Sequence, residues 1–402
     1  MPVYDYRDSY RDDAGQASVA RRAAAPTGSA GHTSRKKKKK KKKMNATLLT
    51  TFVLFGIGIL AVLVYFVFFA GRERTITMTE TPALEGMTHL NTGSGMLYQA
   101  PSDGLGSFNY YDWTRSKRNY TYNIEVNDLK MNGSDGISVV YTEDLLLIVD
   151  TLQQVQMTGT ILSVECGTDH IAVLRRDSVG GESLLILSKN GEQVDQLLAD
   201  GQYIVNFGFY STTTEMLWMQ TLSVSAGSPV TVITTYDLSK RTSTGVMEVQ
   251  DQLVEGLYFT NNSIFVAGTN QIIRYTYDGN KETYKEMIYG YEVLDFSYAS
   301  GTPTFLLGPR EGNMNSIRIL TLNEAETSGA TSTYLQLPGE GVAGYIMNGA
   351  LVVVTEENLY SYTLKGSLSS TSKLDRPVQA AEKISDSLLL FLSNATYCTG
   401  KV

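Results

Sequence analysis

The chain has 402 residues, of which 42% are hydrophobic and 19% are charged, and it contains two cysteines and three histidines. This composition excludes a collagen-like protein, a wholly disordered chain and a disulfide-rich scaffold, and it argues against a zinc site. The net charge of -7 hides a division. Residues 1 to 70 carry 13 of the 34 Lys and Arg and 4 of the 41 Asp and Glu, so a segment of charge +9 precedes one of charge -16, which has 21 basic and 37 acidic residues.

The first 46 residues form a polar tail that is rich in Ala, Ser, Gly, Asp and Arg and nearly lacks aliphatic residues. Such a segment cannot bury enough apolar surface to offset its ordering entropy, so we expect disorder. The tail contains nine consecutive cations, for which we expect contact with anionic lipid: Arg35, Lys36, Lys37, Lys38, Lys39, Lys40, Lys41, Lys42 and Lys43. No nucleic-acid partner is expected, because no aromatic or fold-based reader accompanies the charge.

Residues 48 to 70 form a run of 23 residues without a charge. As a helix this run would extend roughly 34 Å, which is enough for a bilayer core of about 30 Å, and it is longer than the apolar region of a cleavable signal peptide. The adjacent lysines predict that the N-terminus stays in the cytoplasm. The sequence therefore predicts a tail at 1 to 46, a single-pass signal anchor in the cell membrane at 47 to 70 and an extracytoplasmic domain at 71 to 402.

The domain from residue 71 onward is predicted to be all-β. Short runs rich in Val, Ile, Leu, Tyr and Thr alternate with Gly, Asn, Asp and Ser, and no stretch of helical length has a 3.6-residue period. Runs such as Leu145 to Val149 and Leu351 to Val354 are apolar on both faces, which indicates sheets packed against sheets. Asn190-Gly191 and Asp278-Gly279 predict tight hairpins.

A repeated pattern predicts how the sheets are arranged: an apolar and aromatic strand, a tight polar turn, and a strand rich in Thr, Ser and Glu. One strand residue from each repeat gives spacings of 35 to 49 residues: Tyr111, Ile148, Ile186, Thr235, Tyr275, Leu320, Tyr362 and Tyr397. A period of about 41 is typical of the four-stranded blades of a β-propeller. Eight blades are favoured, and seven result if residues 127 to 158 merge with a neighbour. The last unit has three strands of its own, so we expect an early strand, Thr75 to Thr79, to supply its fourth.

This arrangement of basic tail, predicted span and degenerate repeats resembles an uncharacterised "domain of unknown function" family of single-pass, membrane-anchored β-propellers of Gram-positive bacteria. More loosely it resembles the quinoprotein and WD-repeat propellers. The resemblance covers residues 48 to 402 and implies a fold and a cell-surface location, without supplying a catalytic residue. The tryptophan docking motifs of quinoproteins are absent, because Trp113 and Trp218 are the only tryptophans.

In a propeller the first strand of each blade lines the axial channel, and comparable places on these strands carry polar residues. The candidate ligand-binding residues are Ser163, Asn206, Glu255 and Asp295, and Glu255 aligns with Asp295 at an offset of 40 residues. Such a ring could hydrogen-bond a small ligand or hold a hard cation through oxygen atoms. The alternative is a water-filled channel whose polar groups satisfy one another. The sequence selects no metal ligands and no cofactor.

A second candidate site is a cluster of aromatic residues that would suit recognition of a protein or a glycan. The members of this recognition patch are Tyr110, Tyr111, Trp113, Tyr120 and Tyr122. Both alternating faces of the strand are aromatic, however, and packing between neighbouring blades explains that pattern equally well.

No catalytic constellation can be selected from the sequence. Residues 339 to 344 match GxGxxG, but a strand follows them where a dinucleotide site needs a helix, so we predict a loop between blades. The predicted function is a non-catalytic binding or scaffold module for an envelope protein or an extracellular or cell-wall ligand. The alternative is an enzyme that acts on envelope carbohydrate or peptide through acidic residues at the channel.

Overall fold

The computed structural model of the chain falls into two units, Met1–Gly71 and Arg72–Val402, which are described separately. The structure describes residues 54–62, 74–99, 107–115, 117–123, 129–134, 136–198, 202–211, 214–225, 227–250, 252–279, 282–299, 301–323 and 329–402. In the first unit, residues 54 to 62 are helical and lie within the predicted span. No described helix is both long enough and apolar enough to cross a membrane. The rest of the predicted span, the tail and the lysine run lie outside the described residues.

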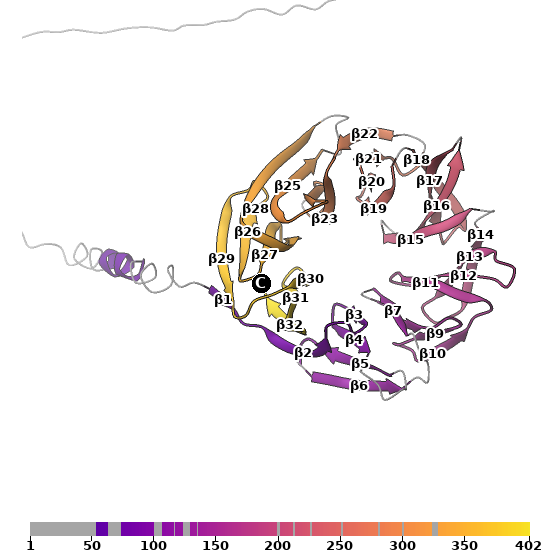
Figure 1. The fold of residues 1–402 in the computed structure, drawn as a ribbon, viewed down its shortest axis with the longest axis horizontal. Coiled ribbons are helices and arrows are strands. Elements are labelled where there is room, and N and C mark those ends of the chain that lie inside the picture. Colours follow the sequence, from indigo (N-terminus) through magenta and orange to yellow (C-terminus); the bar gives the residue numbers. More distant parts are fainter. Residues whose placement is uncertain are drawn as a thin grey trace, which may run out of the picture. The chain divides into compact units, whose positions relative to one another are not determined.

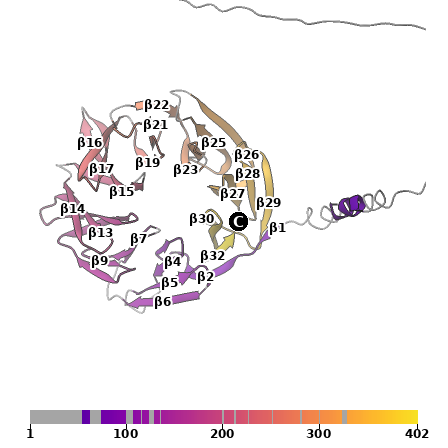
Figure 2. The ribbon, with the colours of Figure 1, turned by 180° about the vertical axis from the view of Figure 1, so that it is seen from behind.

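The second unit consists of β-sheets arranged around a central axis (Figure 1), as the view from behind also shows (Figure 2). Five sheets are formed by four consecutive strands each. Their strands are β3 (His89–Asn91), β4 (Gly95–Gln99), β5 (Ser107–Asp112), β6 (Lys117–Asn123); β7 (Lys130–Gly133), β8 (Ser138–Tyr141), β9 (Leu145–Ile148), β10 (Gln153–Gln156); β11 (Thr160–Cys166), β12 (His170–Arg176), β13 (Glu182–Ser188), β14 (Gln193–Leu198); β15 (Tyr203–Ser211), β16 (Glu215–Ser225), β17 (Ser228–Asp237), β18 (Thr242–Gln250); β19 (Val254–Phe259), β20 (Ile264–Gly268), β21 (Gln271–Tyr275) and β22 (Glu282–Met287).

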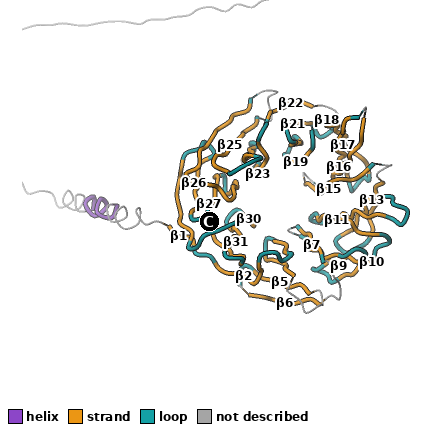
Figure 3. Tube along the Cα trace, in the orientation of Figure 1, coloured by secondary structure: helices purple, strands orange, loops and turns teal. Residues whose placement is uncertain are grey.

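Two further sheets complete the unit, and both include a strand from the beginning of the domain. One has eight strands in the order β1-β29-β28-β27-β26-β25-β24-β23, and the other has four in the order β2-β32-β31-β30. Their strands are β1 (Arg74–Ile76), β2 (Thr79–Leu84), β23 (Tyr291–Ser297), β24 (Thr304–Pro309), β25 (Met314–Leu322), β26 (Ala330–Met347), β27 (Ala350–Thr355), β28 (Asn358–Thr363), β29 (Leu368–Leu374), β30 (Ala380–Ser385), β31 (Leu388–Ser393) and β32 (Thr396–Lys401). The described residues of the second unit form strands joined by turns and loops (Figure 3).

The repeat that the sequence predicts is present. The eight residues that set the period fall on β5, β9, β13, β17, β21, β25, β28 and β32. In each of the five sheets of four consecutive strands, this strand is the third along the chain. Both predicted hairpins are confirmed, because Gly191 lies between β13 and β14 and Gly279 between β21 and β22, with φ angles of 81° and 69°. Glycine adopts this left-handed conformation without a Cβ clash.

The prediction of a loop at the GxGxxG match is wrong. Residues 339 to 344 lie within β26, which pairs with β25 through its first half and with β27 through its second half. This one extended strand joins the two halves of the eight-stranded sheet. The segment lacks the helix N-terminus that a pyrophosphate would need.

The last sheet takes its outer strand from the N-terminal part of the domain, as the sequence predicts, but from different residues. β2 pairs antiparallel with β32, with Thr79 opposite Thr399 and Glu80 opposite Cys398. Thr75 and Ile76 of the predicted segment instead belong to β1, which runs parallel to β29, and Thr79 alone lies in β2. Two short strands thus fasten the beginning of the domain to two different sheets near its end.

The core lies between neighbouring sheets. One cluster packs Leu184 of β13 against Phe207 of β15, and another packs Ile148 of β9 against Val164 of β11; all four side chains are buried. Burying such a side chain contributes about 1.5 to 3 kcal/mol. Sheet-to-sheet packing of this kind covers the apolar runs on both faces, as the sequence predicts.

Candidate functional site

The strands nearest the axis share an irregularity that decides where their polar residues point. β11, β15, β19, β23, β26 and β30 each contain one extra residue relative to the next strand of the sheet. Ser163, Asn206 and Asp295 directly follow this β-bulge, whereas Glu255 is itself the extra residue and Gly256 follows it. Gly256, not Glu255, therefore corresponds to Asp295. The alignment of Glu255 with Asp295 at an offset of 40 residues was wrong by one position. A slip of one residue exchanges the two faces of a strand.

Two of the predicted channel acids are engaged by neighbouring strands. Asp295 accepts a hydrogen bond of 2.7 Å from the backbone N–H of Ile346 and lies 3.6 Å from the Nζ atom of Lys383. Glu255 forms a bidentate pair with Arg310, with both N–O distances 2.6 Å. The Asp295 contacts link β23 to β26 and β30, and the Glu255 pair links β19 to the residue that follows β24. Both carboxylates therefore fasten strands that are not paired with each other.

Asn206 and Glu255 meet at a groove of about 320 Å³ between β15 and β19, lined also by Val205 and Leu253. Ser163 and Asp295 do not line this groove. The structure thus brings two of the four predicted channel residues together. Among the described residues, no group of three or more His, Cys, Asp or Glu side chains could hold a metal ion.

The inner strands also carry two perturbed carboxyl groups. A hydrogen bond to His89 lowers the pKa of Glu382 despite its partial burial, and the same contact raises the pKa of His89. Burial raises the pKa of Glu165, opposed by a hydrogen bond from Asn132. Glu382 lies on β30 and Glu165 on β11, in different sheets. These two carboxyl groups therefore do not form the acid and base pair of a glycoside-cleaving site.

The two thiols are free and lie on different sheets. Cys398 is fully buried on β32, and Cys166 on β11 is partly buried. Burial raises the pKa of both thiols, so the nucleophilic thiolate is disfavoured at each.

The aromatic recognition patch is divided by the fold. Tyr111 is 4% exposed and packs with Trp113 in a cluster that includes Ala83 of β2, so these two rings join the first sheet to the last. The Trp113 indole N–H donates to the carbonyl of Thr92 at 2.9 Å. The side chains of Tyr120 and Tyr122 lie outside the described part of the structure. Tyr110 points the other way, toward the second sheet.

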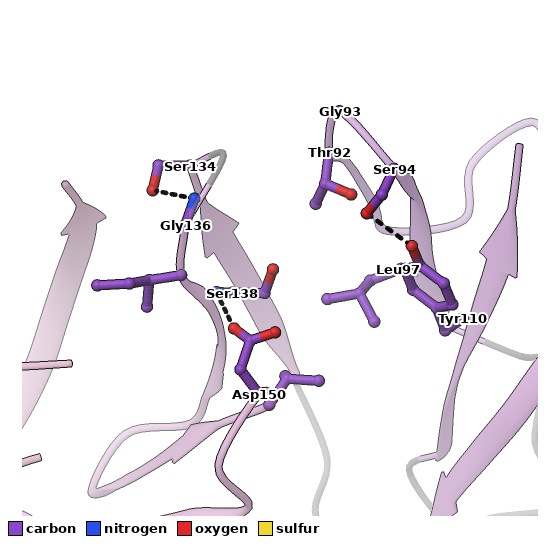
Figure 4. A pocket seen from close by; sticks show the side chains of 11 residues that line it. Thr92, Gly93, Ser94, Leu97, Tyr110, Ser134, Gly136, Ser138 and Asp150 are labelled. Carbon is purple, nitrogen blue, oxygen red and sulfur yellow. Dashed lines mark hydrogen bonds between the residues drawn. The ribbon is translucent and has the colours of Figure 1, made fainter. Parts of the chain in front are cut away.

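Tyr110 forms one wall of a groove that we call the hydroxyl groove (Figure 4). The Tyr110 hydroxyl lies 2.8 Å from the Oγ atom of Ser94 in the turn between β3 and β4. Thr92 closes that turn, because its Oγ1 atom accepts from the N–H of Gly95 at 3.1 Å. A Cβ atom on Gly95 would lie 2.4 Å from the Tyr110 ring, so glycine is needed for the ring to lie against the turn.

The opposite wall comes from the second sheet. The hydroxyl of Ser134 accepts from the N–H of Gly136 at 3.4 Å, and Asp150 accepts from the N–H of Ser138 at 3.0 Å (Figure 4). The groove measures about 450 Å³. Its lining residues are Thr92, Gly93, Ser94, Leu97, Tyr110, Ser134, Gly136, Ile137, Ser138, Val149 and Asp150.

The hydroxyl groove combines hydroxyl groups, one carboxylate, one aromatic ring and an apolar floor of Leu97, Ile137 and Val149. This combination suits recognition of a polar, uncharged or weakly cationic group through hydrogen bonds. Among its described lining residues, Asp150 is the one carboxylate, and none is a histidine or a cysteine. Asp135, between Ser134 and Gly136, lies outside the described residues. Sequence reasoning found Tyr110 but missed the rest, because these residues come from short turns without a motif.

Known structures share the fold of the second unit. The chain is similar to BamB from Moraxella catarrhalis, with 11% identity, 81% of this chain and 100% of that chain covered, and a TM-score of 0.51. It is also similar to the WD40 domain of SCAP from fission yeast (8% identity, 81% and 98% covered, TM-score 0.54) and to Sqt1 from Saccharomyces cerevisiae (11%, 82% and 98%, 0.52). These similarities show a β-propeller fold.

A comparison with curated protein sequences gave no significant match. The model of one protein family, described as "Family of unknown function (DUF5711)", matches residues 148–396, which is more than half of the chain. The matched region begins on β9 and ends at the start of β32, so it covers most of the propeller. The chain therefore belongs to the DUF5711 family of unknown function.

Proposed function

We propose that the chain is a membrane-anchored, extracytoplasmic β-propeller that serves as a non-catalytic binding or scaffold module. Its ligand would be an envelope protein or an extracellular or cell-wall ligand that docks in the hydroxyl groove. The observation that carries the proposal is the groove itself: two sheets offer hydroxyl groups, a carboxylate and a tyrosine ring around one concave surface. A rigid sheet framework that presents polar turns in this way favours recognition.

The anchor is supported by the uncharged run of 23 residues and the preceding lysines. Residues 54 to 62 within that run are helical, and their large apolar side chains are exposed; Leu54 and Phe55 are each 69% exposed. Exposed apolar helix surface is stable where lipid, rather than water, surrounds it. We infer the orientation that the lysines predict, with the N-terminal tail inside the cell and the propeller outside.

We further infer eight blades. Dividing the eight-stranded sheet within β26 gives two runs of four strands, β23 to β26 and β26 to β29. Each run then contains one of the eight residues that set the repeat, and six of the runs begin with a bulged inner strand. Under this division β2 belongs to the last blade, which links the two ends of the domain.

The binding proposal can be tested by photo-crosslinking in intact cells. A photoreactive amino acid at exposed Ser94, on the rim of the groove, should give a discrete adduct. The same amino acid at exposed Lys365, in the turn before β29, should not give it. The Asp150→Lys variant should abolish the Ser94 adduct by reversing the charge of the groove, whereas Glu356→Lys, an exposed charge reversal elsewhere, should leave it intact. An adduct that survives Asp150→Lys would place the partner elsewhere.

A further inference from the structure

A second groove lies where the two ends of the propeller domain meet. It measures about 520 Å³ and lies beside β1, β2 and the end of β32, with Trp113 and Thr114 from the β5–β6 turn on one side. We call it the terminal groove and define it by Arg74, Thr77, Trp113, Thr399 and Lys401. It is separate from the hydroxyl groove, with which it shares no lining residue.

The strand register explains why polar groups gather here. Ile76 and Met78 are each 5% exposed and point into the core, so the alternating Thr75, Thr77 and Thr79 point outward. Thr79 lies opposite Thr399, and Lys401, two residues further along β32, lines the groove together with Thr77. The outward face of this strand pair is therefore built from threonine hydroxyls with a lysine at its end.

The described lining of the terminal groove contains two basic residues and no acidic one. Arg74 and Lys401 are both exposed lining residues, and neither makes a salt bridge with any residue that the structure describes. Lys373 lies opposite Thr75 in the parallel pairing of β1 with β29 and adds a third exposed cation at the edge. These cations stand out in a segment, 71 to 402, that has 37 acidic residues against 21 basic ones.

Three carboxylates that the structure describes beside the groove are engaged by other cations. Arg376 holds Glu80 at 2.6 Å and lies 3.6 Å from Asp375. Asp112 accepts from the backbone N–H of Thr114 at 2.8 Å and lies 3.8 Å from Arg115. Arg74 and Lys401 therefore remain available for an external anion.

We infer that the terminal groove binds a phosphate group. A guanidinium group and an ammonium group beside several hydroxyls provide the charge-assisted and neutral hydrogen bonds that phosphate oxygens accept. Within the described residues, the hydroxyls of Thr75, Thr77 and Thr114 make no hydrogen bond, whereas Thr399 donates to the carbonyl of Thr79 at 3.4 Å. Three hydroxyl donors thus remain for a ligand.

The phosphate has two possible sources, a lipid headgroup and a dissolved phosphate compound. Arg74 follows Ala70, the last residue of the predicted span, by four residues, and an extended link of that length reaches roughly 14 Å. Headgroups of the outer leaflet are then within reach of the groove. The lipid source rests on the proposed membrane anchor, whereas binding of dissolved phosphate does not.

Trp113 provides a reporter for the test, because Trp218 is the only other tryptophan. The full chain carrying Trp218→Phe, in neutral detergent, is titrated with inorganic phosphate while Trp113 fluorescence is recorded. We expect a saturable change, weakened about tenfold or more by Arg74→Gln with Lys401→Gln. Lys365→Gln, which removes one exposed cation elsewhere, should leave the phosphate affinity unchanged.

The lipid arm compares the same protein in nanodiscs of phosphatidylcholine with and without phosphatidylglycerol. A Trp113 response to phosphatidylglycerol that the double variant loses identifies a lipid headgroup as the source, and a response in detergent to inorganic phosphate alone identifies a dissolved one. No response in either arm would overturn the phosphate site. A response that the double variant retains, or that Lys365→Gln also removes, would overturn it as well.

Discussion

The Nε2 atom of His89 lies 3.6 Å from the Oε2 atom of Glu382, and this contact joins β3 at the beginning of the domain to β30 near its end. The imidazole ring of His89 also packs against Tyr397, with ring centroids 4.6 Å apart, and its Nδ1 atom lies 3.2 Å from the carbonyl oxygen of Met87. A residue that titrates near neutral pH therefore lies at the junction between the first and last sheets.

This junction predicts a pH-dependent contribution to stability. The pKa of His89 is raised above its ordinary value of 6.5 by Glu382, so its contribution is complete below 6.5 and is lost as pH rises through the folded-state pKa. The pKa of Glu382 is lowered from 4.5 by His89, so its contribution is present above 4.5 and is lost as pH falls through the folded-state pKa. The pair therefore contributes most to the free energy of unfolding between pH 4.5 and pH 6.5.

We predict that His89→Gln lowers the free energy of unfolding by about 0.5 to 1 kcal/mol at pH 5.5 and by less at pH 8.5, because Glu382 is half-exposed and solvent weakens the pair. Urea unfolding of the full chain in neutral detergent measures the difference. Glu382→Gln should show the same dependence, and the coupling energy between the two variants should shrink at pH 8.5. A coupling energy that does not change with pH would contradict this account.

A second prediction concerns Glu215, whose side chain is 6% exposed and reaches from β16 to the neighbouring sheet. It accepts hydrogen bonds from the Thr168 hydroxyl at 2.8 Å and from the backbone N–H groups of Thr168 and Asp169, and it lies 2.6 Å from His170 Nδ1. Burial alone would raise the pKa of Glu215, but these hydrogen bonds outweigh it and lower the pKa.

Glu215→Ala should reduce the free energy of unfolding at pH 7 by about 1.5 to 3 kcal/mol, because it removes the charged acceptor of several hydrogen bonds that link β16 to the turn at Thr168 and Asp169. Glu192→Ala, which removes an exposed carboxylate from the next hairpin, should cost less than about 0.5 kcal/mol. Since the pKa is lowered, the difference between wild type and Glu215→Ala should decrease as pH falls below 4.5. Equal losses for the two variants in urea unfolding would refute the role of Glu215.

The pairing of β2 with β32 predicts a large effect of deleting residues 74 to 85. The deletion removes Ile76, Met78 and Ala83, which are at most 5% exposed, and leaves the β32 edge unpaired. We expect a loss of at least about 3 kcal/mol, together with aggregation through the open edge. Thermal unfolding and light scattering would show both effects. Deletion of residues 1 to 43 is the control and should leave the unfolding midpoint unchanged.

The repeat could be predicted from the sequence because it depends on local features. A glycine turn follows the third strand at Gly191, Gly279 and Gly366, and that strand carries a buried residue in most units. Both signals survive low similarity between units. The exact closing strand could not be predicted, because β1 and β2 pair with strands about 300 residues away and their short runs fit either register.

The candidate sites were harder to predict for two physical reasons. The bulge in β19 moves Glu255 by one position, and period-2 reasoning along a strand does not reveal an extra residue. The hydroxyl groove and the terminal groove are assembled from turns and chain ends that lie far apart in the sequence, such as Ser94 with Asp150 and Arg74 with Lys401. Only Tyr110 and Trp113 of these grooves had been identified from the sequence, through their aromatic side chains.

The proposed function depends above all on the propeller lying outside the cell. Single cysteines introduced at Ser18, in the tail, and at Ser178, an exposed residue between β12 and β13, test this in a chain whose Cys166 and Cys398 are replaced by serine. A membrane-impermeant thiol reagent applied to intact cells should label position 178 and should reach position 18 only after the cells are permeabilised. Labelling of position 18 but not of position 178 in intact cells would contradict the account.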